Sequence, residues 1–139
     1  MKHRIRPRGV GILTVGNAEM ARELKTYSEA EAQDRLAELG LAKWFVENGW
    51  IRRKYPTDGW QTTLQVVNAI GFLCEAGYHH ADLEVTWGRV LVKLKTHSHR
   101  AITDMDFEMA RRMEDLILWR PLPGQALAGT PNSFVHDKS

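Results

Sequence analysis

The sequence predicts an α+β domain in which an antiparallel sheet carries helices on one face and leaves its other face open. Helical segments with capping signals are interspersed with short segments of alternating apolar and polar residues. The chain has 139 residues, which is the usual length of one domain that buries its own core. Gly88 stands between the last two alternating segments and suits a tight antiparallel connection.

Composition is that of an ordinary globular protein, with 43% hydrophobic and 26% charged residues. The formal net charge of +2 is too weak to argue for direct nucleic-acid binding. The single cysteine, Cys74, excludes an internal disulfide framework and fits a reducing compartment. No apolar run reaches the length of a membrane span, so we expect a cytoplasmic protein without a membrane partner.

The N-terminal segment is basic and then briefly apolar, and glycines interrupt its apolar part. It is too short and too broken for a convincing signal peptide, so residues 1–27 are expected to form a poorly ordered basic arm. A first helix should follow, because Ser28 and Glu31 have the spacing of a capping box. Leu36 and Leu39 supply its apolar side, and Gly40 offers a stop.

The middle of the chain predicts a strand and then a long helix. Residues 50–55 alternate, so that Ile51, Arg53 and Tyr55 oppose the other three side chains, and residues 56–59 read as a turn. A helix should then run from Trp60 to about Gly77. Its expected buried face is wide and includes Leu64, Val66, Val67, Ile70, Gly71, Leu73 and Cys74.

Two further strands and a third helix complete the domain. Residues 82–88 and 89–97 both alternate; Trp87 is expected in the core, and His97 on the side away from it. Thr103 is the expected N-cap of a helix over residues 103–119, with Asp104 and Asp106 at its positive end. The tail over residues 120–139 is rich in proline and is expected to be irregular or ordered by a partner.

Three histidines are candidates for catalysis. His79 and His80 follow the end of the long helix, and His97 stands at the end of a strand, so the three can converge on one rim. Imidazoles titrate near neutral pH, which is what general acid–base catalysis needs.

A metal site is the alternative interpretation of these histidines. His97 and His99 can point the same way on an extended chain, but no cysteine cluster or carboxylate spacing completes a recognisable site. We therefore expect no metal, and we interpret His99 as a surface residue without a chemical role.

The segment from Glu75 to Asp106 resembles the signature of the pterin-4a-carbinolamine dehydratase family. That signature is an acid, a His-His-Pro run, an aromatic residue, a third histidine and an aspartate at fixed gaps. Here it is met by Glu75, His79, His80, Ala81, Trp87, His97 and Asp106. The wider family pattern is largely met by VLVKLKTHSHRAITDMDFEMA, and the similarity extends from about Ser28 to Leu118.

The resemblance implies a four-stranded antiparallel sheet with helices on one side, over residues 28–119, assembled as homodimers or homotetramers. It implies dehydration of a 4a-hydroxytetrahydropterin to a quinonoid dihydropterin, without a metal or organic cofactor. His79 and His97 would be the acids that serve the 4a-hydroxyl from opposite ring faces, and His80 would anchor the pterin and assist proton removal. Glu75, Thr96 and Asp106 would support them, and a helix cap is the alternative role for Asp106.

Three departures from the family pattern favour a second hypothesis. Ala81 replaces the family's proline, Leu83 replaces an aromatic residue, and Arg100-Ala101 replaces a small glycine-containing stretch. If that last site needs a positive φ, Ala101 would be strained, and Arg100 could narrow the pocket. The two extra ends are similar to those of dehydratase-like proteins found with α-carboxysome genes, which are thought to assist RuBisCO assembly. The alternative is therefore an interaction module that binds RuBisCO subunits and does not turn over pterins.

Overall fold

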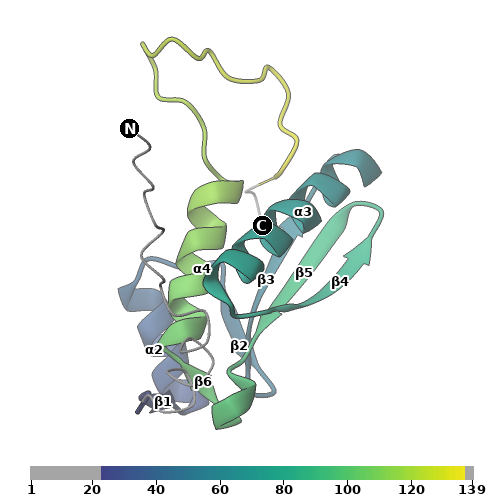
Figure 1. Ribbon diagram of the computed structural model, residues 1–139. Coiled ribbons are helices and arrows are strands. Elements are labelled where there is room, and N and C mark those ends of the chain that lie inside the picture. Colours follow the sequence, from purple (N-terminus) through teal and green to yellow (C-terminus); the bar gives the residue numbers. More distant parts are fainter. Residues whose placement is uncertain (1–22, 137–139) are drawn as a thin grey trace, which may run out of the picture.

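The computed structural model describes residues 23–136 and has the α+β architecture that the sequence predicts (Figure 1). A four-stranded antiparallel sheet has the order β2-β3-β5-β4, and helices pack against it. Its strands are β2 (Phe45–Glu47), β3 (Trp50–Pro56), β5 (Arg89–Leu94) and β4 (Asp82–Thr86). The helices of the described part of the chain are α2 (Glu29–Glu38), α3 (Trp60–Gly77) and α4 (Asp104–Ile117). No helix within residues 23–136 is both long and apolar enough to cross a bilayer.

The alternation in the two central strands sorts the side chains as expected. The inward residues are Ile51, Arg53 and Tyr55 on β3 and Val90, Val92 and Leu94 on β5, and all six are buried. Trp50, Arg52 and Lys54 alternate with them on the open face. A charged residue, Arg53, is thus only 3% exposed on the inner face.

The capping box of α2 is confirmed. Ser28 Oγ accepts a hydrogen bond from the Glu31 amide at 3.2 Å, and the Glu31 carboxylate accepts one from the Ser28 amide at 3.0 Å. These bonds favour the ionised carboxylate and lower the pKa of Glu31. Leu36 is fully buried beneath the helix.

The long helix α3 has the predicted bounds but not the whole predicted buried face. Its buried residues are Thr62, Thr63, Val66, Ile70 and Cys74, whereas Leu64 is 41% exposed and Gly71 is also exposed. The apolar surface of this helix is so wide that its pattern does not show which row faces the sheet. Contact with the sheet selects the row centred on Val66 and Ile70.

A second, two-stranded sheet pairs β1 (Thr26–Tyr27) with β6 (Ile102–Thr103) immediately before α4. Thr26 and Tyr27, the last two residues of the segment expected as an arm, therefore belong to the folded part. Residues 1–22 of that arm lie outside the described residues.

The tail forms no helix or strand between α4 and residue 136, yet its end returns to the domain (Figure 1). The His136 amide donates to Pro56 O at 2.9 Å, and the Asp58 amide donates to Phe134 O at 3.0 Å. Val135 is only 3% exposed and forms an isolated bridge with Thr57. The tail is thus attached at both ends, by α4 and by the segment that follows β3.

One carboxylate ties α4 to the inner face of the sheet. Glu114 Oε1 accepts hydrogen bonds from Arg53 Nε at 2.7 Å, Tyr55 Oη at 2.7 Å and Trp44 Nε1 at 3.1 Å. Without the carboxylate each of these donors would lose a partner, and a buried ion pair that loses one partner is strongly destabilised.

We therefore expect Glu114→Ala to lower the free energy of unfolding by about 3 kcal/mol, as for a buried ion pair that loses one partner. Chemical denaturation followed by circular dichroism measures this change. Asp115→Asn, on the exposed side of the same helix, is the control and should change stability by less than about 0.5 kcal/mol. Equal stability of the Glu114 variant and the control would show that the inner network contributes nothing.

Candidate active site

His79 lies inside the domain because of how α3 ends. The helix stops at Tyr78, whose φ of 51° is left-handed, and the His79 amide then bonds to Cys74 O at 3.1 Å. This reversal turns the His79 ring toward α4, where Nε2 lies 2.6 Å from Asp106 Oδ1. The His79 side chain is 8% exposed and that of Asp106 is fully buried.

Asp106 is the helix-cap residue that the sequence allowed, and it is also the partner of His79. As the third residue of α4, its Oδ2 accepts from the Thr103 amide at 2.9 Å and completes the capping box. The same oxygen accepts from Thr96 Oγ1 at 2.9 Å, and Thr96 in turn contacts Thr103 Oγ1 at 2.7 Å. Three donors therefore orient one carboxylate. An ionised carboxylate only accepts hydrogen bonds, so it favours the tautomer of His79 with the proton on Nε2, which leaves Nδ1 for other partners.

His80 forms a second histidine–carboxylate pair, at the surface. Its Nε2 lies 2.5 Å from Glu75 Oε1, and the two side chains are 54% and 78% exposed. Adjacent histidines thus have different surroundings, one buried and one at the surface. Glu75 lies in the last turn of α3, so helix geometry positions this pair directly.

His97 is not part of β5, which ends at Leu94. It begins a short 3₁₀ turn, η1 (His97–His99), and is exposed. Its ring meets the Trp50 ring edge to face, with centroids 5.6 Å apart. Because His97 directly follows Thr96, it stands one residue from the network around Asp106. His99 contacts only Ser98 Oγ among the described side chains, at 2.9 Å from Nδ1.

Two expectations about neighbouring residues are wrong. Trp87 is 68% exposed, because it sits in the turn between β4 and β5 and not within a strand. The residue with a positive φ in the loop before α4 is Arg100, at 49°, and not Ala101. Ala101 instead pairs with Thr96 in extended conformation, so it is not strained.

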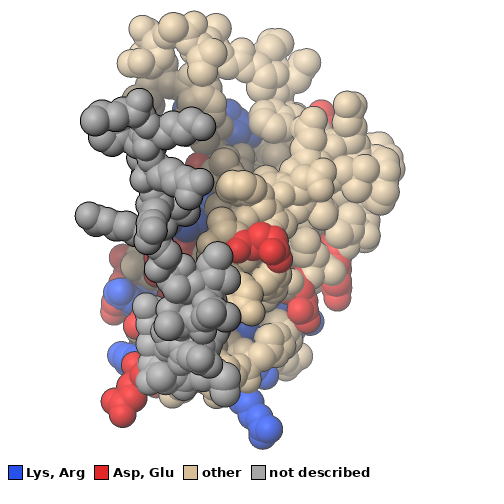
Figure 2. Space-filling model, viewed as in Figure 1, with Lys and Arg blue, Asp and Glu red and all other residues tan. Residues whose placement is uncertain are grey.

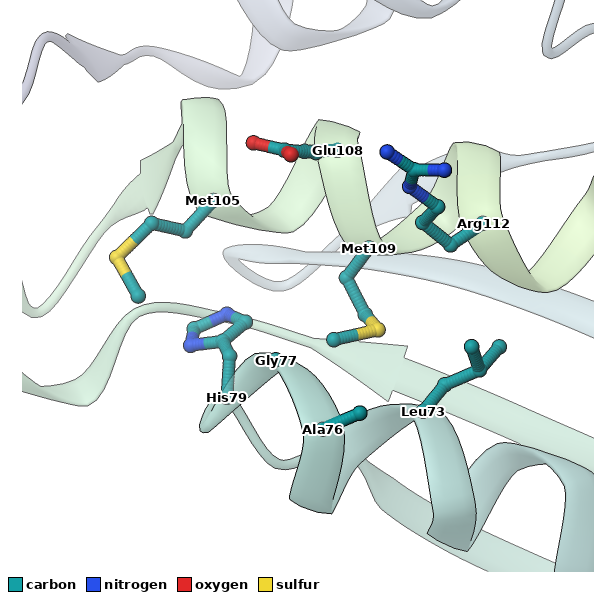
Figure 3. A pocket seen from close by; sticks show the side chains of 8 residues that line it. All are labelled: Leu73, Ala76, Gly77, His79, Met105, Glu108, Met109 and Arg112. Carbon is teal, nitrogen blue, oxygen red and sulfur yellow. The ribbon is translucent and has the colours of Figure 1, made fainter. Parts of the chain in front are cut away.

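A cavity of about 510 Å³ opens beside His79, between the end of α3 and one flank of α4 (Figure 3). Met105 and Met109 hang from α4 toward His79, while Leu73 and Ala76 extend from α3. Glu108 and Arg112 line the same cavity. It is thus an apolar pocket with an imidazole at one end and a charged rim, within the size range of small-molecule sites.

The structure brings some of the predicted site residues into contact and leaves others apart. His79, Thr96 and Asp106 form one hydrogen-bonded network, and His80 and Glu75 form another. Of these residues only His79 lines the cavity, and His97 is placed beside Trp50.

Sequence reasoning missed the wall that α4 contributes. That wall consists of Met105, Glu108, Met109 and Arg112. Their spacing of three and four residues places them next to one another on one side of a helix. This spacing was the signal in the sequence from which the wall could have been predicted.

Thr96 offers a test of the network that leaves every ionisable group in place. Thr96→Val keeps the shape but removes the hydroxyl that Asp106 and Thr103 share. We expect a loss of about 1–2 kcal/mol in the free energy of unfolding, the usual cost of a buried hydrogen bond left unmade. Urea denaturation measures it, with the exposed Thr86→Val as control. A Thr96 variant as stable as that control would contradict the role given to the network.

Comparison with known proteins assigns the family. The family model described as pterin 4 alpha carbinolamine dehydratase matches residues 25–116. A protein of Aquifex aeolicus is 40% identical over 94 residues, covering 68% of this chain and 93% of the relative. One of Haloarcula marismortui is 34% identical over 89 residues, covering 64% and 92%. Both carry the provisional name pterin-4-alpha-carbinolamine dehydratase.

A solved structure agrees with this assignment. The crystal structure of a transcriptional coactivator/pterin dehydratase from Brucella melitensis matches with a TM-score of 0.59 and 26% identity. The match covers 67% of this chain and 98% of that chain, so the tail lies outside the shared domain. The chain belongs to the pterin-4a-carbinolamine dehydratase family.

Proposed function

We propose that this protein is a cytoplasmic hydro-lyase that dehydrates a 4a-hydroxytetrahydropterin to a quinonoid dihydropterin. The buried His79–Asp106 pair beside an open cavity is the observation that carries the proposal. Neither Leu83 nor Arg100, the two residues that could have narrowed a pocket, lines this cavity. Its volume of about 510 Å³ leaves ample room for a bicyclic ring.

The reaction needs only proton transfers. An acid protonates the hydroxyl oxygen on C4a, the C4a–O bond breaks with its electron pair, and water leaves. A base removes a ring N–H proton, whose electrons form the new C=N bond. One proton is added and one removed, so the enzyme ends as it began.

The histidines suit these roles in different ways. Asp106 holds His79 Nε2, so Nδ1 is the atom that would exchange a proton with the substrate. His97, exposed near the same network, would be the acid on the opposite ring face. His80, oriented by Glu75, would anchor the pterin and assist proton removal.

Stopped-flow dehydration of synthetic 4a-hydroxytetrahydropterin tests this proposal. We expect His79→Ala, His80→Ala and His97→Ala each to lower the catalysed rate by about 100-fold, the lower end for loss of a general acid or base. His99→Ala is the matched control and should keep the wild-type rate. His80 is exposed, so its variant also separates a loss of chemistry from a loss of folding.

A wild-type rate no faster than that in buffer would end the catalytic proposal. A normal rate in all three histidine variants would show that other residues do the chemistry.

Assembly into homodimers or homotetramers is part of the proposal. The outer edge of β4 has no partner strand within residues 23–136, and most of that strand is exposed. Free edges of this kind pair readily with a second copy. Light scattering of the purified protein measures the assembly directly.

A second candidate function, as an interaction module for RuBisCO subunits of the α-carboxysome, rests on a different surface. Figure 2 shows a broad region over α3 and the tail with few charged residues. Large apolar side chains exposed there include Trp60, Leu64, Phe72, Trp119, Leu122 and Leu127. Exposed apolar patches of this kind commonly mark protein–protein contacts.

Phe72 is 71% exposed and takes part in none of the hydrogen-bonded networks described above. If the module binds RuBisCO subunits through this surface, Phe72→Glu should weaken the complex at least tenfold, because it places a charge in an apolar contact. Size-exclusion chromatography with light scattering of mixtures with purified RuBisCO subunits measures this, with Glu84→Gln as control. Absence of any wild-type complex would remove the second candidate.

A further inference from the structure

Two cavities flank α4 and share two residues. The first is the pocket beside His79, on the side of α3. The second, of about 430 Å³, lies on the adjoining flank, where α4 faces α2. Glu108 and Arg112 line both cavities, so they form the crest that separates them. Figure 3 shows these two side chains on α4 at the edge of the first cavity.

The second cavity is rich in guanidinium groups. Its lining residues are Tyr27, Arg35, Leu39, Asp104, Phe107, Glu108, Arg111 and Arg112. Three arginines from two helices therefore converge on one hollow with an apolar floor. Guanidinium groups bind carboxylate and phosphate in a bidentate manner, which makes an anion the natural occupant.

Two of the arginines have N–H donors that no described residue accepts. Arg35 Nε is buried and has no hydrogen-bond partner among the residues that the structure describes. Arg112 makes no hydrogen bond or ion pair with any residue between 23 and 136. Arg111 is better satisfied, since it donates to Leu39 O and lies 3.6 Å from Asp115.

The acidic groups nearby do not neutralise these arginines fully. Asp104 accepts a hydrogen bond from Tyr27 Oη at 2.6 Å, and this bond to the carboxylate raises the pKa of Tyr27. Glu38 pairs with Arg35 at 3.1 Å, but the two side chains are 64% and 40% exposed. Exposed pairs of this kind contribute little, so a ligand can compete for the guanidinium.

We infer that the substrate is a pterin whose side chain at C6 ends in an anion. This inference rests on the function proposed above, because it places the ring in the cavity beside His79. The side chain crosses the crest at Arg112, and its anionic end binds among Arg35, Arg111 and Arg112. A pterin with a short neutral side chain would leave the second cavity empty.

The positions of Arg112 and Arg35 separate two sources of negative charge. Arg112 borders both cavities, whereas Arg35 lies on α2 and lines only the second cavity, so a side chain that reaches Arg35 must be longer than one that reaches Arg112. A carboxylate at the end of an aminobenzoylglutamate chain has that reach. A phosphate on a three-carbon chain reaches only Arg112 on the crest.

Binding of three 7,8-dihydropterins to the full chain, measured by calorimetry, tests the inference. One carries a neutral dihydroxypropyl chain, one carries the same chain with a phosphate, and one carries aminobenzoylglutamate. We expect at least one anionic compound to bind about tenfold more tightly than the neutral compound at low salt. This preference should shrink in 0.5 M salt, where exposed charges are screened.

Arginine variants then identify the source of the anion. Arg35→Gln should abolish the preference for the glutamate compound, and Arg112→Gln should abolish a preference for the phosphate compound. Arg52→Gln, which removes the same charge from β3, is the control and should retain the preference.

The outcomes separate the two proposals. Equal binding of all three compounds, unchanged in the Arg35 variant, would overturn the inference and leave the dehydratase proposal intact. Binding of none of them would overturn both. A preference that persists in both the Arg35 and Arg112 variants would also overturn the inference, because the anion would then be held elsewhere.

Discussion

The carboxylate of Asp106 is the constraint on which the candidate site depends. It is fully buried, yet it accepts hydrogen bonds from a helix N-terminus, a strand-end threonine and a histidine. A buried charge is tolerated only when it is satisfied in this way. The carboxylate that begins α4 therefore also holds the ring of His79. The start of this helix and the orientation of His79 depend on a single side chain.

Helix α4 links the other parts of the molecule. Its inner face reaches the sheet through Glu114, and one outer flank supplies the methionine wall beside His79. Its crest, at Glu108 and Arg112, borders the second cavity against α2. A shift of this helix would change the sheet contact, the pocket and the arginine cluster together.

Local signals in the sequence predicted most of the fold. Ser28 and Thr103 begin helices because their hydroxyls accept amide hydrogen bonds, and such caps are readable from spacing alone. Tertiary contacts decide what these patterns leave open. Leu64 is exposed because only one row of a broadly apolar helix can meet the sheet. His79 reaches Asp106 only after Tyr78 ends α3 in a left-handed conformation, and the α4 pocket wall exists only once α3 packs beside it.

A crystal structure of the complex with a 7,8-dihydropterin tests the central claim most directly. The account predicts the ring between α3 and α4, with its C4a–N5 edge within hydrogen-bonding reach of His79 Nδ1, about 3 Å. A ring bound elsewhere on the protein, with His79 Nδ1 facing no ligand atom, would contradict it.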